Sequence, residues 1–155
     1  MSIRRAGPAD RDAIARIETA AFDPGRYVLF SPRQLAANLA NPACRVFVWD
    51  DPDMGVVGYS LGFGRRGQGW LRFYSLAIDP RAKGRGIGEA LFRHFEADAV
   101  QAGFSSVILE IRADNRFLKD RYESLGYRIY RVVDGYYPDG VACLKMRKSV
   151  AAAAR

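Results

Sequence analysis

The hydrophobic positions of this chain follow two spacings, one typical of helices and the other of strands. Apolar residues three to four positions apart predict four helices, at residues 8–22, 31–39, 87–102 and 115–125. Short runs rich in apolar and β-branched residues, bounded by turn residues, predict strands. These runs lie at residues 3–6, 45–49, 56–63, 70–78, 106–112, 127–133 and 141–146. Ser31 followed by Pro32 is typical of a helix N-cap and first helical position.

The order of these elements, β-α-α-β-β-β-α-β-α-β-β, predicts a mixed α/β fold. The turn-rich connections between strands 45–49, 56–63 and 70–78 suit an antiparallel meander. A helix then connects strand 70–78 to strand 106–112, so we expect these two strands to be parallel neighbours. We expect a single domain over residues 1–148 and a disordered tail over residues 149–155.

A glycine-rich segment, Lys83 to Gly88, lies between a predicted strand and an amphipathic helix. Its three glycines alternate with other residues, so backbone N–H groups can approach a ligand closely. The positive end of the helix dipole points at the same place, and Lys83 and Arg85 add positive charge. The segment therefore predicts a phosphate-binding turn.

Nucleotide-binding motifs do not fit the spacing of these glycines. A Walker loop requires Gly-Lys-Ser or Gly-Lys-Thr, whereas Gly88 is followed by Glu89. The dinucleotide fingerprint Gly-x-Gly-x-x-Gly would need a glycine at Glu89 or Leu91. A turn that only caps the helix is the alternative, and the coincidence of three glycines with two cations counts against it.

Composition narrows the classes of function. The chain has 155 residues, a net charge of +7, 20 arginines and 4 lysines. A basic surface can bind nucleic acid, but these arginines are scattered, and a small polyanionic cofactor would benefit equally. The only histidine, His94, argues against a histidine metal site and a Ser-His-Asp triad, and we expect no metal. Cys44 and Cys143 are expected to be buried free thiols.

The apolar runs of the chain predict neither a membrane span nor a signal peptide. No run reaches the roughly 18–20 apolar residues that a membrane span requires. The first residues contain no apolar core typical of a signal peptide. We therefore expect the protein in the cytoplasm. Monomer and homodimer remain open.

Two side chains are candidates for proton transfer. Glu110 is the only acid in the apolar run from Val107 to Ile111, where burial would raise its pKa toward that of a general base. The alternatives are pairing with an arginine such as Arg112, or exposure to water. Tyr122 shares an apolar helix face, which predicts core packing, but a phenol with a pKa of ~10 can also act as a general acid.

Two separated motifs resemble the GNAT superfamily of N-acetyltransferases. The first runs from Leu76-Ala77-Ile78-Asp79-Pro80 through the glycine-rich segment to Ala90-Leu91, and it matches the acyl-CoA signature Arg/Gln-x-x-Gly-x-Gly/Ala. Lys83, Gly86 and Gly88 fill that signature; Arg81, Gly84 and Gly86 fill it in a second frame. The second motif comprises Leu109-Glu110-Ile111-Arg112-Ala113-x-Asn115, Tyr122-Glu123-x-Leu125-Gly126-Tyr127 and Tyr136-Tyr137-Pro138-Asp139-Gly140. It resembles the ribosomal-protein alanine N-acetyltransferase branch.

The resemblance implies a fold, a reaction and a set of site residues. It implies that an acetyl group passes from acetyl-CoA directly to a primary amine, most simply a protein or peptide N-terminal α-amine, with Glu110 as base and Tyr122 as acid. The backbone of Leu76 and Ile78 would hold the pantetheine arm between splayed strands 70–78 and 106–112. Asn115 would also bind that arm. The implied cofactor-binding residues are Leu76, Ala77, Ile78, Lys83, Gly84, Arg85, Gly86, Ile87, Gly88, Asn115 and Arg121. The implied acceptor-binding residues are Phe22, Tyr136 and Tyr137.

Some positions depart from the family pattern. Lys83 stands where Arg or Gln is usual, Leu118 replaces a small residue, and Arg121 replaces an apolar one. These changes alter the width and charge of the expected cofactor groove. Acetylation of a small-molecule amine or a protein lysine, and a non-catalytic acyl-CoA-binding module, are the alternative functions.

Overall fold

The computed structural model describes residues 2–65 and 69–150. In this part of the chain, seven strands form one mixed sheet. The strands are β1 (Ile3–Arg5), β2 (Cys44–Asp51), β3 (Gly55–Phe63), β4 (Trp70–Ile78), β5 (Ser106–Arg112), β6 (Arg128–Val133) and β7 (Cys143–Ser149). The helices are α1 (Arg11–Ala21), α2 (Pro32–Ala40), α3 (Ile87–Gln101) and α4 (Arg116–Ser124), with short 3-10 turns η1 (Pro8–Asp10) and η2 (Pro80–Ala82).

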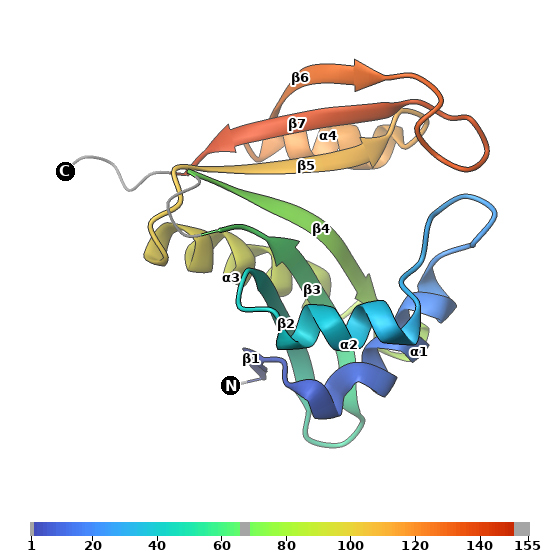
Figure 1. The fold of residues 1–155 in the computed structure, drawn as a ribbon, viewed down its shortest axis with the longest axis vertical. Helices are drawn as coiled ribbons and strands as arrows, with labels where there is room; N and C mark the ends of the chain where they lie inside the picture. Colours follow the sequence, from blue (N-terminus) through green and yellow to red (C-terminus); the bar gives the residue numbers. More distant parts are fainter. Residues whose placement is uncertain (1, 66–68, 151–155) are drawn as a thin grey trace.

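The strands lie in the order β1-β2-β3-β4-β5-β7-β6, and among the described residues β4 and β5 are the only parallel neighbours. Strands β2, β3 and β4 form the predicted antiparallel meander. Figure 1 shows α1 and α2 on the near face of the sheet and α3 and α4 on the far face. The predicted fold class, the meander and the parallel pair are confirmed.

The parallel pair separates along its length. Only four positions pair, from Trp70 with Ser106 to Phe73 with Leu109. Tyr74 has no partner on β3, because Leu61 pairs with Ser75 and Gly62 pairs with Phe73. This bulge bends β4. Beyond it the two strands diverge, as Figure 1 shows, and the facing edges of β4 and β5 carry no ladder between them.

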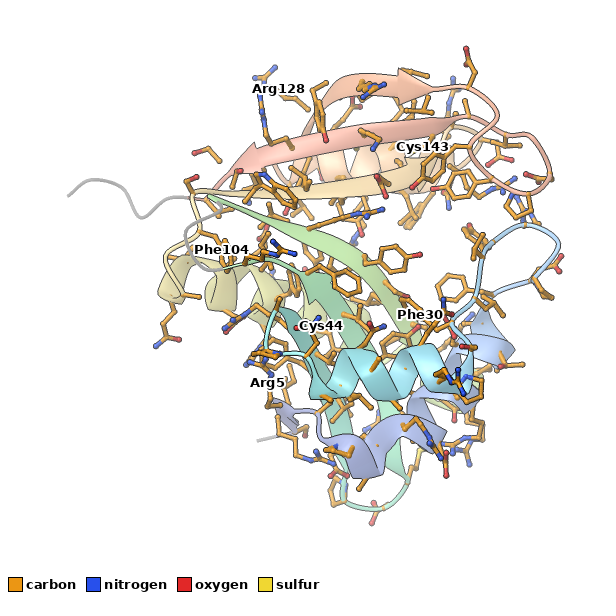
Figure 2. The ribbon with its side chains drawn as sticks, viewed as in Figure 1. Arg5, Phe30, Cys44, Phe104, Arg128 and Cys143 are labelled. Carbon is orange, nitrogen blue, oxygen red and sulfur yellow. The ribbon has the colours of Figure 1, made fainter. Side chains whose placement is uncertain are left out.

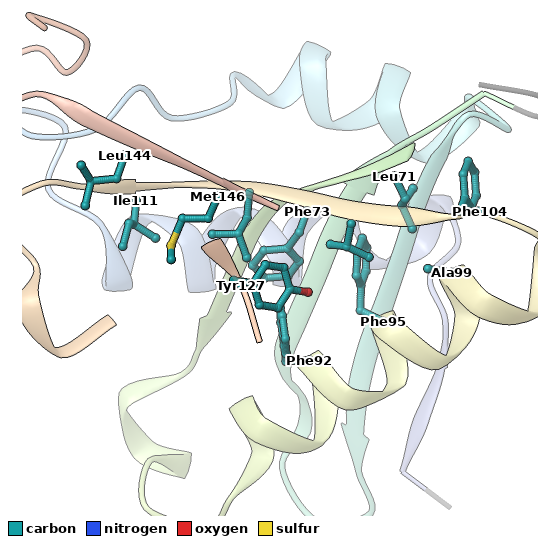
Figure 3. Packing of buried hydrophobic residues seen from close by; sticks show 12 residues of the cluster. Leu71, Phe73, Phe92, Phe95, Ala99, Phe104, Ile111, Tyr127, Leu144 and Met146 are labelled. Carbon is teal, nitrogen blue, oxygen red and sulfur yellow. The ribbon is translucent and has the colours of Figure 1, made fainter. Parts of the chain in front are cut away.

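Aromatic and aliphatic side chains fill the space between this divergent pair and α3. Figure 3 shows Phe73 of β4 between Phe92 and Phe95 of α3, with ring centroids 5.0 and 5.1 Å away. Leu109 and Ile111 of β5 belong to the same cluster. Their neighbour Glu110 must therefore point to the opposite face, since successive side chains of a strand alternate.

The element boundaries differ from the predictions mainly at the ends. Ser31 caps α2 as predicted, because its Oγ accepts a hydrogen bond from the Gln34 amide at 3.1 Å. The last strand begins later than expected and continues through Ser149, which pairs with Ser106. The Val150 amide donates to the Ser105 carbonyl at 2.9 Å. The predicted tail boundary at residue 149 is therefore wrong, because the start of β5 supplies partners for two more residues. Residues 151–155 lie outside the described residues.

Candidate active site

The glycine-rich turn ends at the N-terminus of α3. Gly84 and Gly86 have φ values of +82° and +76°, a left-handed conformation that side chains with a Cβ rarely adopt. Gly86 is the N-cap, and its carbonyl accepts from the Ala90 amide at 3.1 Å. The amides of residues 87–89 precede the first intrahelical bond and remain available. The turn therefore presents a group of backbone donors together with the positive helix end.

A cavity of about 280 Å³ lies beside this turn. It is lined by Ala21, Phe22, Leu76, Ala77, Ile78, Ala82, Lys83, Gly84, Gly86, Ile87 and Gly88. The end of β4 and the turn before α3, which are predicted cofactor-binding segments, therefore share one concave surface with the end of α1. An added Cβ at Gly84 or Gly86 would meet no atom within 4 Å, so the turn is open on its outer side.

The two cations of the turn have different environments. Lys83 lines the cavity. The Arg85 guanidinium instead turns toward the β2–β3 connection, where its Nη2 donates to Asp51 Oδ1 at 2.9 Å. The expectation that the Arg85 side chain adds charge to the turn is therefore wrong, because buried Asp51 binds it. The Arg85 backbone remains in the turn.

Asn115 and Arg121 belong to the start and the last turn of α4. Asn115 is the N-cap, and its Oδ1 accepts from the Leu118 amide at 3.1 Å. Its side-chain amide group keeps two N–H donors for a ligand. Asn115, Arg121 and Arg85 are not among the residues that line the cavity.

Glu110 lies at the point where β4 and β5 separate. Its carboxylate forms ion pairs with Arg72 of β4 and with Lys145 of β7, the latter at 3.0 Å. The Tyr136 hydroxyl donates to Glu110 Oε1 at 3.2 Å. Burial raises the pKa of the carboxyl, but the hydrogen bonds and charges of Arg72 and Lys145 outweigh burial and hold it below the ordinary value. The predicted rise in pKa is therefore wrong.

Arg112 is not the partner of Glu110. Its buried guanidinium pairs with Asp139 at 2.6 Å and with Asp114 at 3.1 Å, and it donates to the Arg26 carbonyl at 3.0 Å. Arg112 lies on the same face as Glu110, two positions along β5, but these carboxylates already hold its guanidinium, and the cations that contact Glu110 come from the neighbouring strands β4 and β7.

Tyr122 lies on the opposite face of the sheet. Its ring packs 5.3 Å from Phe92 of α3 and 5.7 Å from Tyr127, as the apolar helix face predicted. Burial raises the pKa of its hydroxyl to about 12, so the phenol keeps its proton at neutral pH. Glu110 and Tyr122 thus lie on either side of the divergent strands.

Two loops border the Glu110 face. The α1–α2 loop contains Tyr27, whose ring lies 5.1 Å from Phe22 and 5.7 Å from Tyr137 of the β6–β7 connection. Tyr136 lies 5.0 Å from Tyr137. Phe30, labelled in Figure 2, ends the α1–α2 loop with its ring 5.2 Å from Tyr74 of β4. The predicted acceptor residues Phe22, Tyr136 and Tyr137 therefore belong to one aromatic wall.

Arg72, Lys145 and the buried Glu18 were not singled out from the sequence. Arg72 is the only charge in the run from Trp70 to Ile78, the same signal that identified Glu110. Lys145 directly opposes Glu110 on β7. Glu18 of α1 is 4% exposed, its Oε2 accepts from the Phe30 amide at 3.3 Å, and burial raises its pKa.

Cys44 of β2 and Cys143 of β7 are buried and free, as predicted, and lie apart in Figure 2. Among residues 2–65 and 69–150, no cluster of three His, Cys, Asp or Glu side chains could hold a metal ion. None of the helices in these ranges is both long and apolar enough to cross a membrane.

The sequence pattern of the acetyltransferase (GNAT) family matches residues 11–127. An uncharacterized N-acetyltransferase of Methanocaldococcus jannaschii is 32% identical over 149 residues, which is 96% of this chain and 91% of that protein. The chain therefore belongs to the GNAT acetyltransferase family, whose members use acetyl-CoA as co-substrate, and it is an acetyltransferase.

More specific relatives share part of the sequence or the fold. The ribosomal protein bS18-alanine N-acetyltransferase of Escherichia coli is 34% identical over 65 residues, 42% of this chain and 44% of that one. The crystal structure of the ribosomal-protein-S18-alanine N-acetyltransferase from Escherichia coli has a TM-score of 0.86 at 23% identity, covering 99% of this chain and 96% of that one. The crystal structure of Chaetomium thermophilum Naa20 in complex with a bisubstrate analogue has a TM-score of 0.77 at 24% identity, covering 96% of this chain and 86% of that one. Both structures share the fold.

Proposed function

We propose that this acetyltransferase modifies the N-terminal α-amine of a protein or peptide. The observation that carries the proposal is the placement of Glu110 and Tyr122 on opposite faces of the sheet, on either side of the diverging β4 and β5. A proton acceptor on one face and a proton donor on the other suit attack by an amine and departure of a thiolate.

The residues beside the cavity fit coenzyme A. The amides at the start of α3 and the Lys83 ammonium would hold its pyrophosphate, and the unpaired edge of β4 after Tyr74 would hydrogen-bond its arm. Asn115 would donate its free side-chain amide to the same arm. When bound, acetyl-CoA supplies an acetyl group activated as a thioester.

The chain's own residues then move two protons. The acceptor nitrogen forms a C–N bond to the acetyl carbon while the C–S bond breaks. The nitrogen loses one proton toward Glu110, directly or through water, and the Tyr122 hydroxyl gives one proton to the sulfur. Backbone N–H groups of β4 would stabilise the oxyanion. The products are an amide and the coenzyme A thiol.

The low pKa of Glu110 favours an α-amine as acceptor. A carboxylate held by two cations is a weak base, so the acceptor must arrive largely neutral. An α-amine with a pKa near 8 is neutral in roughly one molecule in ten at pH 7, whereas a lysine side chain is neutral in fewer than about one in a thousand. The name of the Escherichia coli relative, an alanine N-acetyltransferase, supports the same choice.

An acceptor panel tests this proposal. The panel contains a lysine-free peptide with a free N-terminus, the same peptide with a blocked N-terminus and one lysine, and small amines. Thiol release measures turnover and mass spectrometry locates the acetyl group. We expect the free N-terminus to react at least about tenfold faster than the lysine. Tyr122→Phe should lower kcat by about a hundredfold, whereas Tyr130→Phe on the exposed face of β6 should not.

Three other results would each contradict part of the proposed function. Preference for the blocked lysine peptide or for a small amine would refute the α-amine assignment. Retained coenzyme A binding without acetylation of any acceptor would identify a non-catalytic acyl-CoA-binding protein. Unchanged turnover of Tyr122→Phe would remove Tyr122 from the role of acid.

A further inference from the structure

The charges of the Glu110 face are unevenly distributed, with two cations at Glu110 and two carboxylates at Arg112. Arg72 and Lys145 both contact the single carboxylate of Glu110. Two further cations of this region, Arg112 and Arg26, are already paired with Asp114 and Asp139. Beside Glu110 itself, two cations therefore face one carboxylate, and partial burial makes this local positive excess more effective than it would be in water.

Arg72 has unused hydrogen-bonding capacity. Its Nη2 serves both Glu110 and the Tyr136 hydroxyl, the latter at 3.4 Å. Its Nε is buried and has no hydrogen-bond partner among the described residues. A guanidinium offers five N–H donors arranged to bind a carboxylate through two of them. Glu110 and Tyr136 engage only Nη2, and the buried Nε is out of reach of a ligand, so Nη1 is the nitrogen through which Arg72 can bind a second acid.

The position of Arg72 indicates that this second acid would belong to the acceptor. Its guanidinium lies 5.0 Å from the centre of the Tyr74 ring, which orients its plane. Its side chain is 31% exposed and that of Lys145 is 23% exposed. Both belong to the face bordered by the α1–α2 loop and the β6–β7 connection, opposite the face of Tyr122. An incoming acceptor would meet these two cations beside the proposed base.

We propose that Arg72 and Lys145 bind a carboxylate carried by the first residue of the acceptor, so that the preferred substrates are peptides beginning with Asp or Glu. This inference rests on the proposed function and names its substrate class. The acid of the acceptor competes with Glu110 for Arg72 and brings a like charge close to it. Both effects make Glu110 a better proton acceptor when the correct substrate is bound.

Peptides that differ only in residue 1 test this specificity. Glu and Gln have nearly the same shape, as do Asp and Asn, so each pair isolates the charge. We expect kcat/KM to be about tenfold higher for the Glu peptide than for the Gln peptide, and likewise for Asp over Asn. Free glutamate and free glutamine form a further arm that distinguishes a small acidic amine from a peptide.

Substitution of the cations tests the assignment to these residues. The measured quantity is the ratio of kcat/KM for the peptide beginning with Glu to kcat/KM for the peptide beginning with Gln. This ratio should fall toward one in the variant Arg72→Gln and should fall severalfold in the variant Lys145→Gln. Arg147→Gln is the matched control, because Arg147 lies two residues along β7 on the same face and contacts Tyr130 instead. It should leave the ratio unchanged. Thermal unfolding shows that each variant is folded, and the wild-type peptide pairs give an answer without any variant.

The results separate this inference from the proposed function. Acetylation of Gln and Ala peptides with no preference for Glu or Asp would refute the acidic substrate class and leave the proposed function standing. A preference that survives in Arg72→Gln would remove Arg72 from the role. If no peptide is acetylated, the proposed function fails and this inference fails with it. A preference for free glutamate over every peptide would show that the two cations bind the carboxylate of a small acidic amine. It would refute the proposal that the acceptor is a peptide.

Discussion

Glu110 and Arg72 belong to different strands, and their contact changes what each side chain can do. An isolated glutamate in an apolar strand would have a raised pKa. With Arg72 and Lys145 beside it, the pKa of Glu110 is lowered. The carboxylate therefore stays charged at neutral pH and holds a proton weakly. At the scale of the residue, the two neighbouring cations set the affinity of Glu110 for a proton.

The pH dependence of kcat/KM should follow the acceptor amine. A carboxyl group with a lowered pKa becomes protonated only as the pH falls below the ordinary range of glutamate, so Glu110 is deprotonated at about pH 5 and above. For a peptide starting with Ala, we expect log kcat/KM to rise with unit slope up to about pH 8, the pKa of the α-amine. Initial rates across this range provide the measurement. A fixed inflection between about pH 5 and pH 7, unmoved by acceptors of different amine pKa, would point instead to a group with a raised pKa, such as Glu18.

At the scale of the element, α3 is flanked at both ends by a glycine in the left-handed conformation. The helix begins after Gly86 and is followed by Gly103, whose φ values are +76° and +89°. Neither glycine has an atom within 4 Å of an added Cβ. The two ends therefore have the same conformational requirement, but only the first lies at the cavity.

Alanine at these two glycines separates stability from cofactor binding. Gly86→Ala and Gly103→Ala should each lower the free energy of unfolding by about 1 kcal/mol, because each forces a Cβ into the left-handed region. Only Gly86→Ala should also raise KM for acetyl-CoA, by about tenfold, because it reorients the amides that precede Ala90. Chemical denaturation and steady-state kinetics measure the two effects. An equal change of KM in both variants would show that the turn does not bind the cofactor.

At the scale of the whole molecule, Arg112 connects three distant segments. It extends from β5 to Arg26 in the α1–α2 loop and to Asp139 in the β6–β7 connection. Its guanidinium lies 5.4 Å from the Tyr27 ring centre and 5.2 Å from that of Tyr137. These loops lie on the same side of the sheet in Figure 1. The two loops that border the Glu110 face are therefore tied to the sheet by one buried cation.

Removing this cation should affect the acceptor more than the cofactor. Arg112→Met should lower the free energy of unfolding by about 2 kcal/mol, because several charge-assisted hydrogen bonds are lost. It should raise KM for the peptide more than KM for acetyl-CoA. Arg93→Met is the control, since Arg93 makes only an exposed helix pair with Glu89 among the contacts the structure describes, and should change stability by less than about 0.5 kcal/mol. A parallel rise of both KM values would mean that Arg112 supports the fold in general.

Much of the fold could be predicted from local signals. Strand 70–78 and strand 106–112 have the predicted bounds, and the connecting helix implied their parallel order. The pairing of Glu110 could not be predicted, because it depends on the register between strands far apart in the sequence. Arg72 and Glu110 are 38 positions apart, and nothing local places them together. The Arg85 side chain was misjudged for the same reason, since Asp51 lies 34 positions away.

By itself, the sequence determined the order of elements, the glycine-rich turn before α3 and the family. Those features depend on local backbone preferences and on residues adjacent in the chain, so spacing alone carries them. Only the tertiary structure decided that β4 and β5 pair over four positions and then separate. It also decided that two cations from neighbouring strands hold Glu110. The physical reason is that electrostatic interactions act across space, and the distances between charged groups are set by packing and register once the whole sheet has formed.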